Sequence, residues 1–217
     1  MKKLNGFIDN NIKEDCISVR IVLCIFLIKL VYLVFFVACH HIYIQNDIQG
    51  LFVSTGDTGS YFSALENWLR GGSLGTIERM PGIYPIYAPL YILGGHFFAS
   101  NALVIIQFIV SVISVVVLGK VSLYIFNKPQ VAFFVMFLYT ISSFVSNFDI
   151  MGMMDSLSVS TLIFGVYFYV SFRKKRTILL LLFSGFFLTW SFFFREVGIF
   201  AIVIIGLSLL INEIKST

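Results

Sequence analysis

The chain has 217 residues, of which 59% are hydrophobic and only 12% are charged. Soluble domains carry about a quarter charged residues, so this composition excludes an ordinary soluble protein and predicts an integral membrane protein. The net charge of +4 does not indicate a nucleic-acid partner, because the basic residues lie at the ends of apolar segments.

Apolar segments follow one another along most of the chain, separated by short polar or charged stretches. A helix needs about 20 residues to cross a hydrocarbon core about 30 Å thick. The segments therefore predict an all-α fold, a polytopic transmembrane helix bundle. In chain order they are 21–43, 84–98, 102–126, 131–148, 156–172, 178–194 and 197–211.

The segment 84–98 is too short to cross, since a helix of this length reaches about 22 Å. It also begins with Tyr84-Pro85 and is interrupted by Gly94-Gly95. If it lies along the outer surface, the basic residues near the N-terminus and the basic run 173–176 all face the cytoplasm, as the positive-inside rule requires. We therefore predict about six spans, an interfacial helix at 84–98 and both termini in the cytoplasm.

This topology predicts a single domain, which we expect in the plasma membrane of a bacterium. It divides the chain into a cytoplasmic leader 1–20, a transmembrane module 21–211 with an outer loop 45–83, and a cytoplasmic tail 212–217. Two further polar turns, at 149–155 and at Arg195-Glu196, fall on the same outer face as the loop.

Asp149 and Lys29 are charged residues to which no role in the outer loop is assigned. Asp149 is expected to be solvated in its turn. Lys29 lies deep within the first span, where an ionisable side chain is unusual, and the sequence assigns it no function.

Residues 58–70 of the outer loop predict an amphipathic helix. Phe62, Leu65, Trp68 and Leu69 recur at helical spacing on one face. Asp57 is placed to cap the start of this helix, and Gly71-Gly72 to end it. On local grounds alone, Asp57 is a helix cap and Tyr61 an aromatic residue at the membrane interface.

A series of motifs runs from this loop towards the end of the chain. The loop contains Asp57-x-x-x-Tyr61-x-x-Ala64, then Gly71-Gly72, then Arg79-x-Pro81-x-x-Tyr84-Pro85. Met153-Met154-Asp155 opens a later span, and Gly185-x-x-x-Thr189 is followed by Arg195. In this order the motifs resemble the GT-C glycosyltransferases. More narrowly, they are similar to the protein-O-mannosyltransferase and aminoarabinose-transferase branch, which uses polyprenyl- or dolichyl-phosphate-linked sugars.

The resemblance implies inverting transfer of a sugar from a lipid-linked phosphate donor to an extracytoplasmic acceptor. Such a reaction needs a base for the acceptor proton and positive charge on the departing phosphate. By the matching positions, the acidic residues of the site are Asp57 as base, Asp155 and Glu78. Arg79 and Arg195 would bind the donor phosphate, and Tyr61, Trp68 and Tyr84 would line the acceptor groove.

Simpler interpretations of these residues stay open. Asp155 is also a polar residue at the start of a span, and Glu78 can pair with Arg79 alone. The sequence predicts no metal site and no cofactor, although a divalent cation at Asp57 and Asp155 would fit relatives that use one.

Two other functional hypotheses stay open as well. Members of the resembling family are longer, so the chain would then be a truncated inactive relative, or half of a split enzyme whose partner subunit supplies further helices. The other hypothesis is a small membrane transporter or scaffold. A transporter should carry ionisable groups on broken helices at mid-membrane, and Lys29 is the one such group within the spans.

Overall fold

The computed structural model describes residues 19–43, 48–53, 58–73, 81–142, 145–146, 149, 154–196 and 198–214. Apart from one two-residue β-hairpin, the regular elements in these ranges are helices, so the predicted all-α class is confirmed. Asp57, Glu78 and Arg79 lie outside the described residues, as does the side chain of Tyr61.

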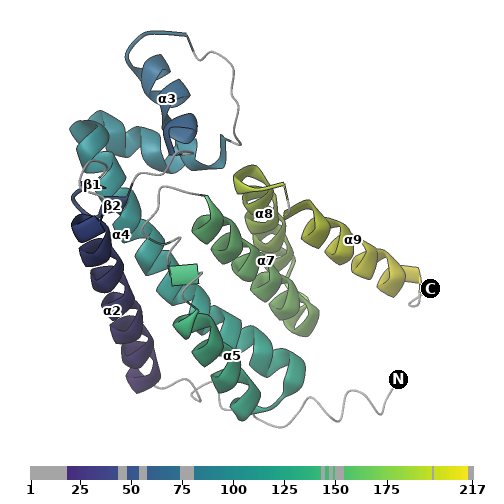
Figure 1. Ribbon diagram of the computed structural model, residues 1–217. Coiled ribbons are helices and arrows are strands. Elements are labelled where there is room, and N and C mark those ends of the chain that lie inside the picture. The colour runs from purple at the N-terminus through teal and green to yellow at the C-terminus, as the bar shows by residue number, and fades with distance from the viewer. Residues whose placement is uncertain are drawn as a thin grey trace.

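The bundle consists of long apolar helices that lie side by side (Figure 1). α7 packs against both α4 and α8, while α2 and α5 pack against α4, and α9 packs mainly on α8. The helices are α2 (Val19–Tyr43), α4 (Tyr84–Phe126), α5 (Pro129–Ile141), α7 (Asp155–Lys175), α8 (Ile178–Phe194) and α9 (Gly198–Ile214).

Three of these helices, α2, α4 and α7, are long and apolar enough to cross a membrane. The helices α5, α8 and α9 are apolar but shorter; α5, with 13 residues, reaches about 20 Å. Large hydrophobic side chains such as Leu27 and Phe35 on α2 are exposed, as expected for surfaces that face lipid. The membrane class is thus supported, and the number of about six spans stays a prediction.

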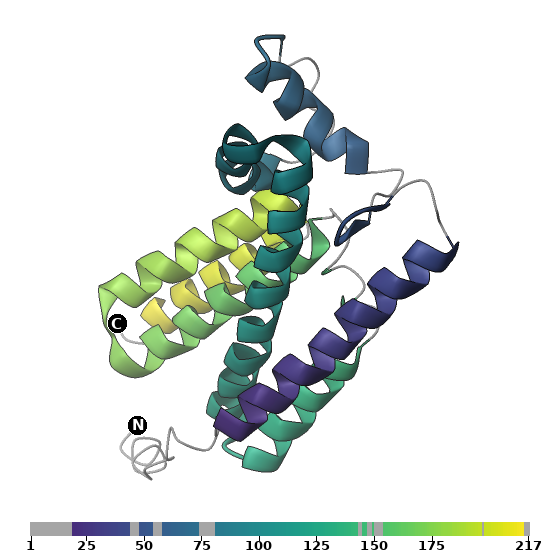
Figure 2. The same ribbon diagram turned by 90° about the vertical axis from the view of Figure 1, so that its left-hand side faces the viewer.

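Basic residues gather at one end of the bundle. Arg20 lies at the start of α2, Lys128 in the turn between α4 and α5, and the run 173–176 at the end of α7. Figures 1 and 2 show these three places at the end of the bundle opposite to α3. This grouping is the one that the positive-inside argument requires; the side of the membrane that it faces stays a prediction.

The helix α4 is broken at Gly95. Its φ of 71° and ψ of −169° lie in a region open to glycine and costly for other residues. The chain changes direction there, and Figure 2 shows the short first part of α4 set across the long second part. The interruption expected at Gly94-Gly95 is therefore confirmed, while the position of the first part on the membrane surface stays a prediction.

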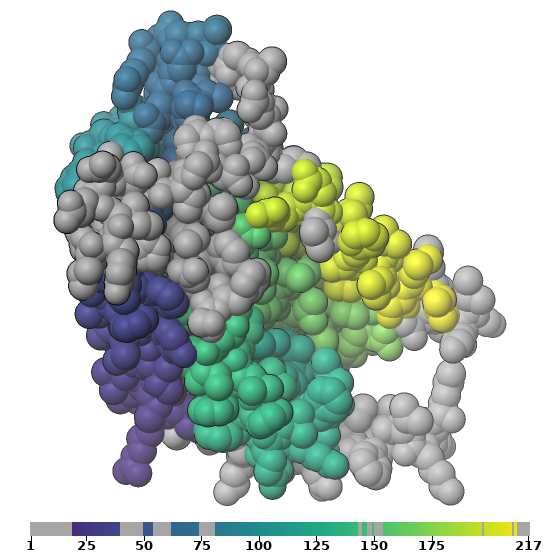
Figure 3. All heavy atoms as spheres, in the orientation of Figure 1, coloured from purple at the N-terminus to yellow at the C-terminus, as the bar shows by residue number. Residues whose placement is uncertain are grey.

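A small lobe sits on the first part of α4. It contains α3 (Thr58–Leu69) and a hairpin of β1 (Ile48–Gln49) and β2 (Phe52–Val53). In Figure 3 the α3 part of this lobe projects beyond the bundle. The helix predicted at 58–70 is present, and Gly71, with a φ of 88°, ends it.

The face that α3 buries differs from the predicted one at Trp68. Phe62 and Leu65 are buried, and the Phe62 ring stacks on Tyr87 with centroids 4.3 Å apart. Trp68, however, is 53% exposed. Glu66 belongs to the contact face, which shifts the centre of that face to about 100° from Trp68 around the helix.

Close packing of α7 against α8 makes a testable prediction. A Cβ on Gly165 would meet the side chain of Leu188 at 2.7 Å. Gly165→Val should therefore force the helices apart and lower the free energy of unfolding by about 1–3 kcal/mol. Thermal unfolding in detergent would measure this loss. Gly185→Ala is the matched control, because a Cβ there meets nothing within 4 Å; equal effects of the two substitutions would contradict the packing.

Candidate functional site

Two of the predicted site residues meet at one end of the α7–α8 hairpin. Asp155 is the first residue of α7, and Arg195 follows the last residue of α8. The Nη2 of Arg195 donates to Oδ2 of Asp155 at 2.6 Å. The two side chains are 39% and 25% exposed, respectively, so the ion pair remains accessible to a ligand.

Small polar residues explain why α7 and α8 come close enough for this pairing. The hydroxyl of Ser191 donates to the carbonyl of Ser158 at 2.9 Å, and that of Ser184 donates to the carbonyl of Gly165 at 2.8 Å. Contacts of this type let helix backbones approach closely in membranes. Because α7 and α8 are antiparallel neighbours, the start of one and the end of the other share one end of the bundle.

The end of the outer loop docks at this place. The short 3-10 helix η2 (Pro81–Ile83) packs against α8. Nε1 of Trp190 donates to the carbonyl of Gly82 at 3.0 Å. A Cβ on Gly82 would lie 2.5 Å from the carbonyl oxygen of Phe193, so only glycine allows this approach. Pro81, the last residue of the Arg79-x-Pro81 motif, thus belongs to an element that packs on α8, the helix that Arg195 follows.

The predicted groove aromatics fall in different places. Tyr84 follows η2 directly and packs, half-buried, against the apolar core that contains Ile83 and Phe194. Trp68 lies on the exposed side of α3. The described residues therefore associate Tyr84 with the Asp155–Arg195 region and leave Trp68 on the lobe.

A partly buried polar cluster that sequence reasoning missed fastens α3 to α4. The Glu66 carboxylate accepts from the Tyr87 hydroxyl at 2.6 Å and lies 2.7 Å from Nδ1 of His96. Because a carboxylate only accepts hydrogen bonds, Nδ1 of His96 carries the proton in this arrangement. His96 directly follows Gly95, so the cluster also holds the break in α4. The sequence carries no signal for it, since the contact needs α3 to fold onto the first part of α4.

Arg70 adds a second contact between the same elements. Its Nε donates to the Tyr91 hydroxyl at 2.7 Å, and a Glu66 oxygen lies 3.7 Å from its Nη2. The hydrogen bond to Tyr91, helped by the charge of Glu66, raises the pKa of Arg70 above its usual value. Arg70 thus stays charged at any physiological pH.

The interior of the bundle contains an ion pair that the sequence did not predict. Nζ of Lys29 donates to Oδ2 of Asp149 at 2.9 Å. Asp149 is only 2% exposed, so the expectation that it is solvated is wrong. A lysine deep in a span needs an acidic partner or polar group. That requirement was the signal in the sequence that could have identified Asp149, which lies between two predicted spans, as the partner of Lys29.

The described part of the site does not fit a divalent cation at Asp155. The carboxylate that would bind the cation already accepts from the Arg195 guanidinium, whose positive charge opposes a second cation nearby. Among the described residues, no group of three His, Cys, Asp or Glu side chains is placed to hold a metal ion.

The chemistry available at this end of the bundle is that of anion binding. A partly exposed guanidinium offers a planar set of N–H donors that match phosphate oxygens, and an adjacent carboxylate can accept from a hydroxyl group.

No protein-family model, curated protein or solved structure matches the chain.

The docking of η2 on α8 can be tested by fluorescence. The chain has two tryptophans, so in a Trp68→Phe background only Trp190 emits. Adding Gly82→Ala should displace η2, because the new Cβ meets the Phe193 carbonyl, and should shift the Trp190 emission to longer wavelength with stronger iodide quenching. Gly206→Ala is the matched control, since a Cβ there meets nothing within 4 Å. An unchanged spectrum with Gly82→Ala would contradict the docking.

The Glu66 cluster predicts that two substitutions reduce the protection of the α3 amides from hydrogen exchange to different extents. Glu66→Ala removes the carboxylate that the Tyr87 hydroxyl and His96 share and leaves Tyr87 the ring nitrogen of His96 at 3.0 Å; losing a buried hydrogen bond to a charged group costs about 1–3 kcal/mol. Tyr87→Phe removes the hydroxyl together with its need for a partner, so it should cost less. Hydrogen exchange of the α3 amides would measure both, and a larger effect of Tyr87→Phe would contradict the arrangement.

Proposed function

We propose that this chain is an integral membrane glycosyltransferase that transfers a sugar from a polyprenyl- or dolichyl-phosphate donor to an extracytoplasmic hydroxyl acceptor. The observation that carries the proposal is the Asp155–Arg195 ion pair at 2.6 Å, at the end of the bundle where η2 docks. Motif residues far apart in the sequence thereby reach one region, as a common site requires.

Arg195 binds the phosphate of the donor in this proposal. The donor's hydrocarbon tail stays in lipid, so its phosphate must be recognised at the membrane boundary. Arg195 ends an apolar helix and is 39% exposed, which suits that position. When the bond from the sugar to the phosphate breaks, the leaving oxygen takes the electron pair, and the guanidinium stabilises the charge that develops.

The acidic residues act on the acceptor. Asp57, assigned by the family resemblance alone, takes the proton of the acceptor hydroxyl as its oxygen attacks the anomeric carbon. Asp155 accepts from the acceptor and orients it, and it also compensates the charge of Arg195 before the donor binds. Glu78 and Arg79, by the same resemblance, complete the acidic site and the phosphate contacts.

One observation favours a second candidate, a small membrane transporter. The buried Lys29–Asp149 pair gives the bundle interior the ionisable groups that transport through broken helices requires. Against this, the Lys29 ammonium already donates to Asp149 and Ser111 and lies 5.9 Å from the centroid of the Tyr139 ring, so its charge is neutralised within the bundle. We therefore favour transfer at the bundle end over transport through its interior.

A transfer assay tests the proposal. Membranes that contain the chain are incubated with labelled polyprenyl-phosphate sugars and a hydroxyl acceptor. Arg195→Gln should lower the rate about 10²–10³-fold, and Asp57→Asn about 10²–10⁴-fold. Glu196→Gln is the matched control, because it neutralises the exposed neighbour of Arg195 and should leave the rate nearly unchanged.

The outcomes separate the hypotheses. Transfer that survives Asp57→Asn would sink the mechanism, and equal losses with Arg195→Gln and Glu196→Gln would remove Arg195 from phosphate binding. Absence of transfer with every donor would favour the truncated or split relative. Accumulation of a solute in proteoliposomes without transfer would favour the transporter.

A further inference from the structure

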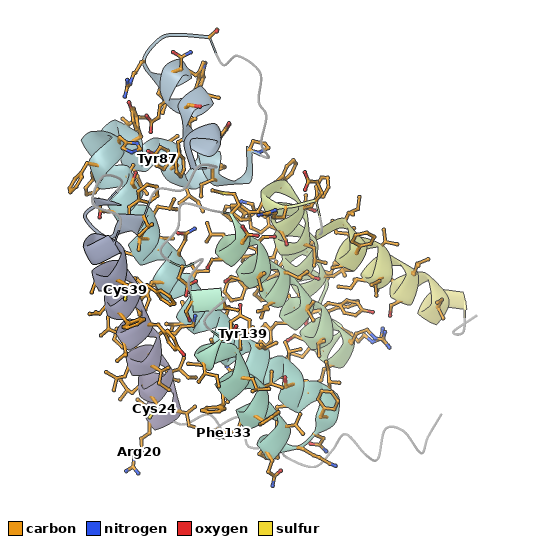
Figure 4. The ribbon with its side chains drawn as sticks, viewed as in Figure 1. Arg20, Cys24, Cys39, Tyr87, Phe133 and Tyr139 are labelled. Atoms are coloured by element: carbon orange, nitrogen blue, oxygen red, sulfur yellow. The ribbon has the colours of Figure 1, made fainter. Side chains whose placement is uncertain are left out.

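The ion pair between Lys29 and Asp149 is the most deeply buried charged feature among the described residues. Its side chains are 1% and 3% exposed. Nζ of Lys29 donates to Oδ2 of Asp149 at 2.9 Å and to Oγ of Ser111 at 2.7 Å. It also lies 5.9 Å from the centroid of the Tyr139 ring, which Figure 4 labels within the bundle. The ammonium group of this α2 residue thus lies among Ser111 of α4, Tyr139 of α5 and Asp149.

Stability alone does not account for such a pair. Moving two charges out of water costs several kcal/mol for each ion, and apolar residues of similar volume often stabilise a fold as well or better. A buried ion pair instead fixes the relative position of its partners, because their attraction weakens when either partner is displaced. The question is therefore which part of the structure the pair holds in place.

The second oxygen of Asp149 answers this question. The hydroxyl of Ser156 donates to Oδ1 of Asp149 at 2.5 Å. Ser156 is buried in the first turn of α7 and directly follows Asp155, the partner of Arg195. One carboxylate thus connects Lys29 on α2 to the turn of α7 that carries the proposed site.

Contacts to α8 also hold this turn, because the hydroxyl of Ser191 donates to the carbonyl of Ser158 at 2.9 Å. The N-cap residue of α7 is Met154, whose side chain has no oxygen to cap the helix. Met154 and Leu157 pack in the apolar core, and apolar contacts tolerate sliding better than directional polar contacts do. The hydrogen bond from Ser156 to Asp149 adds a directional contact on the other side of the turn and ties it to Lys29 on α2.

We propose that Lys29 and Asp149 are positioning residues that act through Ser156 to hold Asp155 at hydrogen-bond distance from Arg195. The catalytic consequence rests on the proposed function. The positional consequence does not, because it concerns only where the start of α7 lies against the end of α8.

Cysteine cross-linking measures that position directly. Ser158 and Ser191 flank the Asp155–Arg195 pair, and their Oγ atoms lie 3.4 Å apart. In a chain whose native cysteines are replaced by alanine, cysteines at 158 and 191 should form a disulfide rapidly under mild oxidation. Lys29→Met and Asp149→Asn should each lower the rate at least several-fold. Lys120→Met is the matched control, because Lys120 is an exposed lysine of the bundle outside the pair.

A double variant keeps the proposal testable if the single variants fold poorly. Removing one partner leaves a buried unpaired charge, whereas Lys29→Met combined with Asp149→Leu leaves none, so the double variant should unfold at a higher temperature than either single variant. Its disulfide should still form several-fold more slowly than in the parent, because Ser156 has lost its acceptor. A folded double variant that cross-links at the parent rate would overturn the proposal.

The transfer assay supplies the catalytic readout on the same variants. In the Lys29 and Asp149 variants Asp155 is displaced while Arg195 keeps its contacts with the donor. We therefore expect kcat to fall tenfold or more while KM for the donor changes less. Slower cross-linking with unchanged kcat would overturn the positioning role. Slower cross-linking in a chain that shows no transfer at all would keep the positional inference and reject the proposed function. Unchanged cross-linking in every variant would reject the inference whatever the transfer rates are.

Discussion

Close packing of α7 against α8 is the interaction on which the rest of the described structure depends. Gly165 makes room for Leu188, and the hydroxyls of Ser184 and Ser191 donate to carbonyls of α7. In a bilayer, lipid tails are as apolar as leucine, so helices associate through such close contacts and not through the hydrophobic effect. Because the two helices are antiparallel, their packing brings Asp155, at the start of α7, next to Arg195, which follows the end of α8. It also presents the end of α8 as the surface on which η2 docks.

The two ion pairs of the bundle serve different purposes because their surroundings differ. Asp155 and Arg195 are partly exposed, so water screens their attraction and a phosphate or hydroxyl group can compete for either partner. Lys29 and Asp149 are excluded from water, so their attraction is strong and neither is available to a ligand. The first pair therefore suits recognition and the second suits the maintenance of geometry. Ser156, next to Asp155 in the sequence, joins the two.

The features that the sequence could predict are those that local patterns determine. Apolar periodicity located the helices, and Gly71 and Gly95 marked an end and a break because both have positive φ. Counting spans placed the turns of Asp155 and Arg195 on one face, but it did not predict that the two side chains form an ion pair. The Glu66–His96 contact and the burial of Asp149 could not be predicted in this way. They depend on how α3 folds back on α4 and on how deeply Asp149 is buried, and neither has a periodic signal. Trp68 shows the same limit, since helical spacing gives the width of an apolar face but not the side on which a neighbour packs.

Polar contacts define the register of this bundle because its apolar contacts are so alike. The chain contains 25 phenylalanines, and many line the outer faces of α5, α8 and α9. A helix that slides by one turn exchanges one set of aliphatic and aromatic contacts for a similar set, so packing alone separates the two positions weakly. Each polar group meets its partners at one position along the helix axis, and the shift of about 5 Å that a turn represents breaks these bonds together. The pairs Lys29–Asp149, Ser156–Asp149 and Ser191–Ser158 thus select one register among several that the apolar surfaces would accept, and the geometry of Asp155 and Arg195 follows from that selection.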